Sequence, residues 1–157
     1  MKIYLLTHER ELNKASNTGR LVKKCLKEQA EVIIWKRKEP DETLLELICS
    51  GELAMLFPEQ KQDQPASTEP VSIENFERFI ILDSTWQEAR KMYNRSFYLQ
   101  QIKKINLNTK QTSVYCKRRN QIEGGLSTAE CVIELLKQKK NKSLAKSLQT
   151  EFDLFNK

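Results

Sequence analysis

One corner of the sequence combines an acid, two hydroxyls and an indole, because Asp83, Ser84, Thr85 and Trp86 follow one another directly. The apolar residues before this corner predict a buried strand, and the polar residues after it predict a helix. A carboxylate between a strand and a helix can accept a proton or orient an amine. The structural alternative is that Asp83 caps the helix and Trp86 packs in the core.

A second polar stretch follows the first apolar run of the chain. It contains His8, the only histidine, and then the run Asn17, Thr18, Gly19 and Arg20. His8 is either a hydrogen-bonded residue at a strand end or a substrate contact that carries a proton. Asn17 or Thr18 can cap the next helix, and Gly19 allows a backbone or a ligand to come close. Helix amino termini also attract phosphate.

A third stretch, GGLSTAE, begins at Gly124. The two glycines make a flexible approach, and Ser127 or Thr128 can then cap a helix with Glu130 close by. The functional alternative is a loop that wraps a small ligand. Such a loop would use glycine backbone amides and the two hydroxyls.

The charge distribution is uneven along the chain. Residues 89–122 contain no acid, although acids are plentiful elsewhere. The same stretch has nine basic residues and four aromatic ones: Arg90, Lys91, Arg95, Lys103, Lys104, Lys110, Lys117, Arg118 and Arg119, with Tyr93, Phe97, Tyr98 and Tyr115. A basic tract with interleaved aromatics suits a polyanion with stackable bases. RNA is favoured over duplex DNA, because no helix-turn-helix or zinc-finger pattern occurs. The alternative is a solvated basic face without a partner.

The elements that must position these residues alternate between strands and helices. Strands are expected at 2–7, 31–36, 52–57 and 78–82, with two less distinct ones at 104–108 and 113–118; helices at 18–29, 41–49, 84–93, 126–138 and after 141; and a surface loop at 59–72. This alternation predicts an α/β fold with a mostly parallel sheet and helices on both faces. Ligands bind beyond the carboxyl ends of strands in such sheets.

Length and composition narrow the class of protein. The chain has 157 residues, which suits a single domain, and a net charge of +6, which favours an anionic partner. No apolar run is long enough to span a membrane, and the start of the chain does not resemble a signal peptide, so we expect a cytoplasmic protein. The four cysteines lie far apart, so no metal site is expected. We expect Cys25, Cys49 and Cys131 to be buried thiols.

The string LDSTWQEARKM at residues 82–92 resembles the signature of the DTW-domain family, the tRNA-uridine aminocarboxypropyltransferases. Further segments match in the same order: His8, Glu11 and NTG at 17–19; WKRKEP at 35–40; LFP at 56–58; and Arg118 followed by GLSTAEC at 125–131. The resemblance extends from about Tyr4 to Leu136. It therefore covers nearly the whole chain.

This resemblance implies a fold and a reaction. The fold is SPOUT-like, an α/β knot with S-adenosylmethionine held in a knotted carboxyl-terminal region, and residues 1–157 form a single DTW-type catalytic domain. The reaction transfers the 3-amino-3-carboxypropyl group of S-adenosylmethionine to N3 of a tRNA uridine and releases 5′-methylthioadenosine. Two features depart from the family. The amino-terminal cysteine cluster of many bacterial relatives is absent, and Glu9 replaces the proline that often follows the histidine.

The resemblance also suggests roles at the site. Asp83 accepts the N3 proton or pairs with the ammonium group of the donor, Thr85 positions the amino-acid arm, and Trp86 lines the pocket, stacks on the uracil or belongs to the core. The adenosyl part is held by two segments, Leu56, Phe57 and Pro58, and Gly125, Leu126, Ser127 and Thr128.

The remaining predicted contacts are with the substrates. Arg118 or Arg20 binds the donor carboxylate or an RNA phosphate. The tRNA backbone is assigned to Arg90, Lys91, Arg95, Lys103 and Lys104, and further substrate contacts to His8, Asn17, Thr18 and Gly19.

Three other functions remain open at this point. One is an S-adenosylmethionine-dependent RNA methyltransferase of the same fold, and the second is a non-catalytic RNA-binding module. The third is a cysteine hydrolase with His8 as its base, although no cysteine occupies a nucleophile-like turn. The tRNA, the uridine and the oligomeric state are left open.

Overall fold

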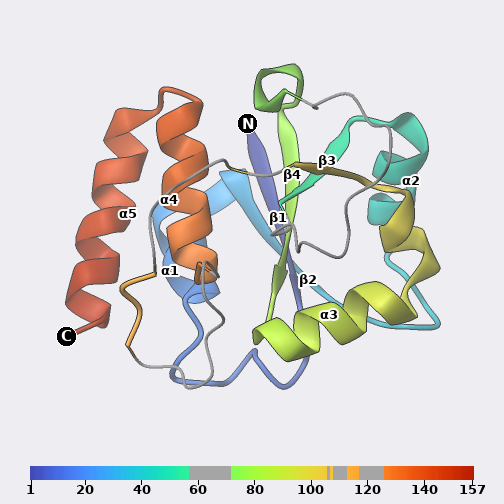
Figure 1. Cartoon of the computed structure of the whole chain (residues 1–157), viewed down its shortest axis with the longest axis horizontal. Coiled ribbons are helices and arrows are strands. Elements are labelled where there is room, and N and C mark those ends of the chain that lie inside the picture. Colours follow the sequence, from blue (N-terminus) through green and yellow to red (C-terminus); the bar gives the residue numbers. More distant parts are fainter. Residues whose placement is uncertain (57–71, 106, 108–112, 117–125) are drawn as a thin grey trace.

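The computed structural model describes residues 1–56, 72–105, 107, 113–116 and 126–157. Within them lies a five-stranded sheet in the order β2-β1-β4-β3-β5 (Figure 1). The strands are β1 (Lys2–Thr7), β2 (Ala30–Ile34), β3 (Leu53–Leu56), β4 (Arg78–Asp83) and β5 (Lys103–Ile105). Every pairing among these strands is parallel, as the sequence alternation predicts.

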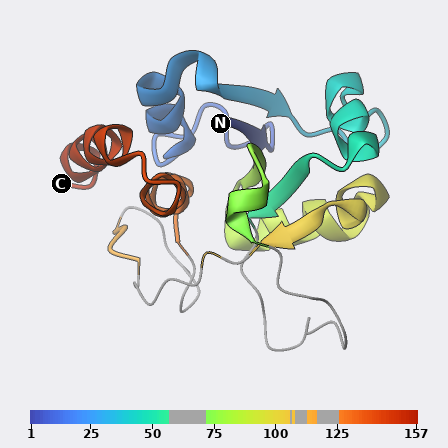
Figure 2. The ribbon, with the colours of Figure 1, turned by 90° about the horizontal axis from the view of Figure 1, so that it is seen from above.

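Helices cover both faces of this sheet, which confirms the predicted layering (Figures 1 and 2). The first face carries α1 (Gly19–Leu26), α4 (Thr128–Gln138) and α5 (Lys142–Phe155), and the second carries α2 (Glu42–Ser50) and α3 (Trp86–Arg95). Three short 3-10 helices complete the described elements: η1 (Lys27–Gln29), η2 (Ile73–Asn75) and η3 (Phe97–Gln101).

The two central strands supply both cores, because successive side chains of a strand point to opposite faces. In β1, Ile3 and Leu5 join the core under α1, α4 and α5, whereas Tyr4 and Leu6 join the core under α2 and α3. In β4 the residues alternate in the same way from Phe79 to Leu82. Because both faces of these strands are buried, their sequences are continuous apolar runs rather than alternating apolar and polar residues.

The caps of the helices place two of the corner residues. Asp41 caps α2 as expected, since its Oδ1 accepts a hydrogen bond from the Leu44 amide at 3.1 Å. At α3 the capping residue is Thr85, whose hydroxyl accepts from the Glu88 amide at 3.2 Å. The structural alternative, in which Asp83 caps this helix, is therefore wrong. The Asp83 carboxylate accepts hydrogen bonds from other segments.

The segment predicted as a strand at 113–118 is not a strand in its described part, residues 113–116. Its backbone amides bind side chains instead of a neighbouring strand. The Val114 amide donates to Glu130 Oε2 at 3.0 Å, and the Cys116 amide donates to Asn156 Oδ1 at 3.0 Å. The β-propensity of this segment is thus overridden by tertiary contacts.

The expected burial of the cysteines is only partly correct. Cys25 and Cys131 are half-buried, but Cys49 is exposed. The apolar stripe of α2 that faces the sheet consists of Leu44, Leu47 and Ile48, and Cys49 lies beyond this stripe on the helix.

Several expectations lie wholly or partly outside the described residues. The loop at 59–72 does so, apart from Ser72, and a knotted carboxyl-terminal region depends largely on the path of residues 106–125, so the knot stays a prediction. In the described part of the chain, no helix is both long enough and apolar enough to cross a membrane. The same residues contain no cluster of three or more metal-ligating side chains.

Candidate functional site

Asp83 is the last residue of β4 and the centre of a buried polar cluster. Its side chain is almost inaccessible, since the residue is only 2% exposed. Oδ2 accepts hydrogen bonds from the Thr7 hydroxyl and the Asn17 amide, each at 3.1 Å. Oδ1 accepts from the Thr128 hydroxyl at 2.9 Å. One carboxylate thus connects β1, the segment before α1, and the first turn of α4.

The parallel sheet explains why these residues meet. β1 and β4 are neighbours, and their register pairs Thr7 with Asp83, so both strands end at the same level. At this edge α1 and α4 also begin, and the Thr18 hydroxyl accepts a hydrogen bond from the Ala129 amide at 3.1 Å. Since α3 begins three residues after Asp83, three helix amino termini converge on the carboxyl edge. Their positive ends favour negative charge there.

Gly19 fits into this cluster because it has no side chain. A Cβ atom at this position would lie 2.4 Å from Asp83 Oδ2 and 3.0 Å from Asn17 Oδ1. Asn17 Oδ1 in turn accepts from the Arg20 amide at 3.2 Å and so supports the first turn of α1. Gly19 thus permits a close approach, but the neighbour is the Asp83 side chain rather than the expected backbone or ligand.

The environment of Asp83 acts on its pKa in two directions. Burial raises the pKa above its ordinary value of 3.8, while the hydrogen bonds from Asn17, Thr128 and Thr7 oppose this change. The charge of Glu11 adds to the increase. The balance lies on the side of a raised pKa, because three neutral donors replace the water that an exposed carboxylate would have.

Two further buried carboxylates lie near this edge. Glu11 is 1% exposed, and its Oε1 accepts from the Lys14 ammonium at 3.1 Å. Glu130 forms a capping box with Ser127 at the start of α4. It also accepts from the Ser113 hydroxyl at 2.6 Å, which fastens residues 113–114 to the helix. Negative charge is therefore concentrated around the first turns of α1 and α4.

The rest of the DSTW corner faces the second core. Trp86 is the first residue of α3 and is half-buried against the core under α2 and α3. The guanidinium of Arg90 lies 5.8 Å from the centroid of the Trp86 ring, which is a cation–π arrangement. The Thr85 hydroxyl is engaged in capping α3. Among these residues, Asp83 forms the described hydrogen bonds to Asn17 and Thr128.

His8 lies beside this corner, on the α3 side. Its Nδ1 accepts from the Arg10 amide at 3.1 Å, and its Nε2 is 3.6 Å from Glu88 Oε2. The ring stacks on Trp35, with centroids 5.6 Å apart and planes inclined by 26°. The Nδ1 atom is thus engaged by the Arg10 amide, and Nε2 faces Glu88. This arrangement fits a positioning role better than that of a general base.

The predicted RNA-contacting residues divide into exposed and engaged ones. Lys91, Arg95 and Lys103 are exposed on α3 and β5. The Lys104 ammonium lies 4.2 Å from the Tyr93 ring centroid. Arg20 is engaged next to the cluster: its Nε donates to the Asn17 carbonyl at 3.4 Å, its Nη2 donates to the Ala15 carbonyl at 2.8 Å, and its guanidinium lies 5.7 Å from the Phe155 ring centroid.

The predicted adenosyl-contacting residues are described only in part. Leu56 ends β3 and is buried in the first core. Leu126 is half-buried, and Ser127 and Thr128 are buried at the start of α4. The other predicted residues of this group and of the substrate group, Phe57, Pro58, Gly125 and Arg118, lie outside the described residues.

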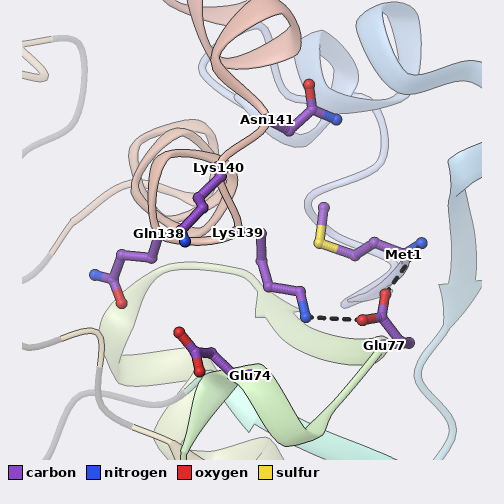
Figure 3. A pocket seen from close by; sticks show the side chains of 7 residues that line it. All are labelled: Met1, Glu74, Glu77, Gln138, Lys139, Lys140 and Asn141. Atoms are coloured by element: carbon purple, nitrogen blue, oxygen red, sulfur yellow. Dashed lines mark hydrogen bonds and ion pairs between the residues drawn. The ribbon is translucent and has the colours of Figure 1, made fainter.

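A hollow of about 390 Å³ lies at the opposite end of the sheet (Figure 3). Its lining includes Glu77, just before β4, and Lys139, just after α4. Figure 3 shows the Lys139 ammonium bound to Glu77, at 2.9 Å, and the amino group of Met1 near the same carboxylate, at 3.5 Å. None of the predicted site residues that the structure describes lines this hollow.

The sequence does not indicate the roles of two residues at this edge. It predicts Thr7 only as the end of a strand, and Glu130 only as a neighbour of a cap. A polar residue at the last position of an apolar strand could have indicated Thr7, because that position faces the carboxyl edge. Glu130 could have been found from its place three residues after Ser127, which is the capping-box spacing.

Comparison with known proteins identifies a family and a curated relative. A family model described as the DTW domain matches residues 1–157. A curated protein of Macaca fascicularis, tRNA-uridine aminocarboxypropyltransferase 2, is 28% identical over 141 residues, which cover 82% of this chain and 44% of that protein. The chain thus spans less than half the length of that curated relative. No solved structure matches.

Proposed function

The chain belongs to the DTW domain family, and from this premise we propose that it transfers the 3-amino-3-carboxypropyl group of S-adenosylmethionine to N3 of a uridine in tRNA, in the cytoplasm. In this reaction N3 loses its proton, a bond forms to the methylene carbon beside sulfur, and 5′-methylthioadenosine leaves. The observation that carries the proposal is the Asp83 cluster. It joins the DSTW corner, the NTG turn and the STAE segment at one edge of the sheet.

The described residues fit a donor of this charge pattern. A sulfonium and an ammonium are cations, and the buried carboxylates of Asp83 and Glu11 lie at the same edge. The donor's own carboxylate is an anion, and the positive ends of the α1, α3 and α4 dipoles lie at the same edge. S-adenosylmethionine supplies an electrophilic carbon, and the protein must present the amino-acid side rather than the methyl group.

For Asp83 we propose that the carboxylate keeps the first turn of α4 and the NTG turn in the geometry that the donor requires. Its burial beneath these segments and its three hydrogen bonds support this positioning role. The two earlier roles, acceptor of the N3 proton and partner of the donor's ammonium, require an oxygen to become accessible to a ligand. Trp86 and Thr85 remain predicted site residues beside the same corner.

On the RNA side, we propose that the exposed cations of α3 and β5 contact phosphates. Lys91, Arg95 and Lys103 are exposed and lie on elements that continue from the DSTW corner. Phosphate contacts of this kind orient a nucleic acid without reading its sequence.

The decisive experiment incubates the protein with S-adenosylmethionine and total tRNA from cells that lack the modification. Nucleoside mass spectrometry should find an aminocarboxypropyl uridine, and chromatography should find 5′-methylthioadenosine. S-adenosylhomocysteine would instead indicate a methyltransferase. Absence of both products, with intact tRNA binding, would indicate a binding module and overturn the proposal.

Cysteine hydrolysis, the third alternative, is not supported by the two partly buried thiols, Cys25 and Cys131. Burial raises the pKa of the Cys131 thiol to about 12, and burial also raises the pKa of Cys25. Neither thiol is therefore prepared to act as a thiolate nucleophile.

A further inference from the structure

An exposed basic segment follows β2 and lies outside the basic tract that the sequence reveals. It consists of Lys36, Arg37 and Lys38, and all three residues are exposed. Glu39 follows, so three cations and one carboxylate leave a net charge of +2. No ion pair within the described part of the chain involves any of the three cations.

Two hydrogen bonds attach this segment to the end of α3. The Trp35 indole donates to the Ser96 hydroxyl at 2.7 Å, and the Tyr98 hydroxyl donates to the Lys36 carbonyl at 3.1 Å. Ser96 and Tyr98 flank Phe97 directly in the sequence. The position of Phe97 relative to Lys36 is thus fixed by contacts on both sides of it.

Phe97 is the most exposed large hydrophobic residue among the described ones, with 75% of its surface accessible. By contrast, Ser96 and Leu99 in the same short segment are buried, so the segment is packed against the core while the Phe97 ring points into solvent. An exposed aromatic ring on a segment that is bonded to Lys36 and follows Arg95 suits single-stranded nucleic acid, since bases stack on such rings and phosphates bind such cations.

The same surface leads back to the candidate site. α3 begins beside Asp83 and ends at Arg95, a length of about 15 Å. Arg95 immediately precedes Ser96, so the exposed cations of α3 continue into the surface around Phe97.

We propose that Phe97 stacks on an unpaired RNA base while Lys36, Arg37, Lys38 and Arg95 contact the adjoining phosphates. This surface, called the Phe97 surface below, would hold the RNA beside the DSTW corner. The inference rests on the proposed function, because it assigns the contact to the RNA substrate of that reaction. It also names RNA-binding residues outside the tract at 89–122.

The ring is tested by substitution. Phe97→Ala should weaken binding of a fluorescein-labelled single-stranded RNA by about tenfold in anisotropy titrations. Phe97→Tyr should restore the affinity, because tyrosine also stacks. The matched control is Leu154→Ala, which removes another large exposed side chain, 60% accessible, on α5. It should leave the affinity unchanged.

The cations are tested by their effect on salt dependence. Lys36→Ala, Arg37→Ala and Lys38→Ala together should reduce the slope of log affinity against log salt by about 2, since each single-strand phosphate contact contributes about 0.7. The control removes the same charge from α5 and the end of the chain, with Lys142→Ala, Lys146→Ala and Lys157→Ala. Its slope should change by less than 1.

The outcomes separate this inference from the proposed function. If the wild-type protein modifies tRNA but Phe97→Ala binds RNA normally, the inference is overturned and the proposed function stands. If the variants lose RNA binding but the wild-type protein forms no product, the inference about the Phe97 surface stands and the proposed reaction is overturned. Equal losses for heparin and RNA in the charge variant, without an effect of Phe97→Ala, would indicate a general polyanion surface and overturn the inference.

Discussion

At each end of strand β4 a carboxylate binds a side chain at the matching end of helix α4. We call the Asp83–Thr128 contact the buried tie and the Glu77–Lys139 contact the exposed tie. At the carboxyl end, Asp83 binds Thr128 at the start of the helix. At the amino end, Glu77 binds Lys139 just after the helix, as Figure 3 shows. Each tie holds one end of α4 against β4, the central strand of the sheet.

The difference lies in solvent access and in the partners. Asp83 is 2% exposed and accepts hydrogen bonds from neutral groups, whereas the Glu77 side chain is 68% exposed and faces an ammonium. Burial therefore raises the pKa of Asp83, and the hydrogen bond from Lys139 lowers the pKa of Glu77. A buried tie is costly to break because its partners lose their acceptor, while an exposed tie is replaced by water.

The strongest test of this contrast removes the buried acceptor. Asp83→Ala leaves the donors of Thr7, Asn17 and Thr128 without their shared acceptor and should lower the free energy of unfolding by about 3–5 kcal/mol. Asp83→Asn should cost only about 1 kcal/mol, because the Thr128 hydroxyl can rotate to accept from the new amide. Urea unfolding followed by circular dichroism measures both. Equal losses for the two variants would contradict the role of the three hydrogen bonds.

The second test adds a methyl group next to Asp83 without changing the charge of any residue. Gly19→Ala places a Cβ atom against Asp83 Oδ2 and should destabilise the fold by about 1–3 kcal/mol while reducing transfer. Gly51→Ala is the control. It sits at a φ of 72° with no atom near the added methyl, so it should cost about 1 kcal/mol and leave transfer unchanged. Normal transfer by Gly19→Ala would separate the cluster from the reaction.

The third test uses pH. A raised pKa in the folded state means that the stabilising contribution of Asp83 is fully present below 3.8 and is lost as the pH rises through the folded value. The stability of Asp83→Asn should therefore improve relative to the wild-type protein as the pH rises above about 4. Paired urea titrations at pH 4 and pH 7 report this difference. A change in the opposite direction would show that the carboxylate is favoured in its ionised form by the fold.

The smallest effect is expected at the exposed tie. Glu77→Gln should lower the free energy of unfolding by less than about 1 kcal/mol, and the difference should vanish in high salt. Since the folded pKa of Glu77 is lowered, its contribution is present above 4.5 and is lost as the pH falls through the folded value. A loss as large as that of Asp83→Ala would remove the distinction between the two ties.

The sequence predicts the layers of this fold better than the contacts between them. Apolar runs alternating with amphipathic helices predict the parallel sheet, and an acid at the end of a strand predicts that Asp83 lies at the carboxyl edge. Its partners could not be predicted, because they depend on β1 lying next to β4. Strand–helix alternation permits several strand orders, and only those with β1 next to β4 bring Thr7 against Asp83.

Two local expectations failed for a related reason. Asp83 and Thr85 are both good capping residues, and the choice between them depends on where β4 ends against β1. The segment at 113–116 has strand-forming residues, but Glu130 and Asn156 occupy its backbone amides. Those partners lie 16 and 40 residues away in the chain, beyond the range of any local pattern.

The hydrogen bonds of Asp83 also bear on how the protein is made. They connect residues separated by 76, 66 and 45 positions, and the farthest downstream partner is Thr128. A ribosome releases the chain from its amino terminus, so β1 and β4 are outside the exit tunnel well before Thr128 emerges. A nascent chain therefore carries an incomplete corner until Thr128 has emerged, and the last hydrogen bond becomes possible only then.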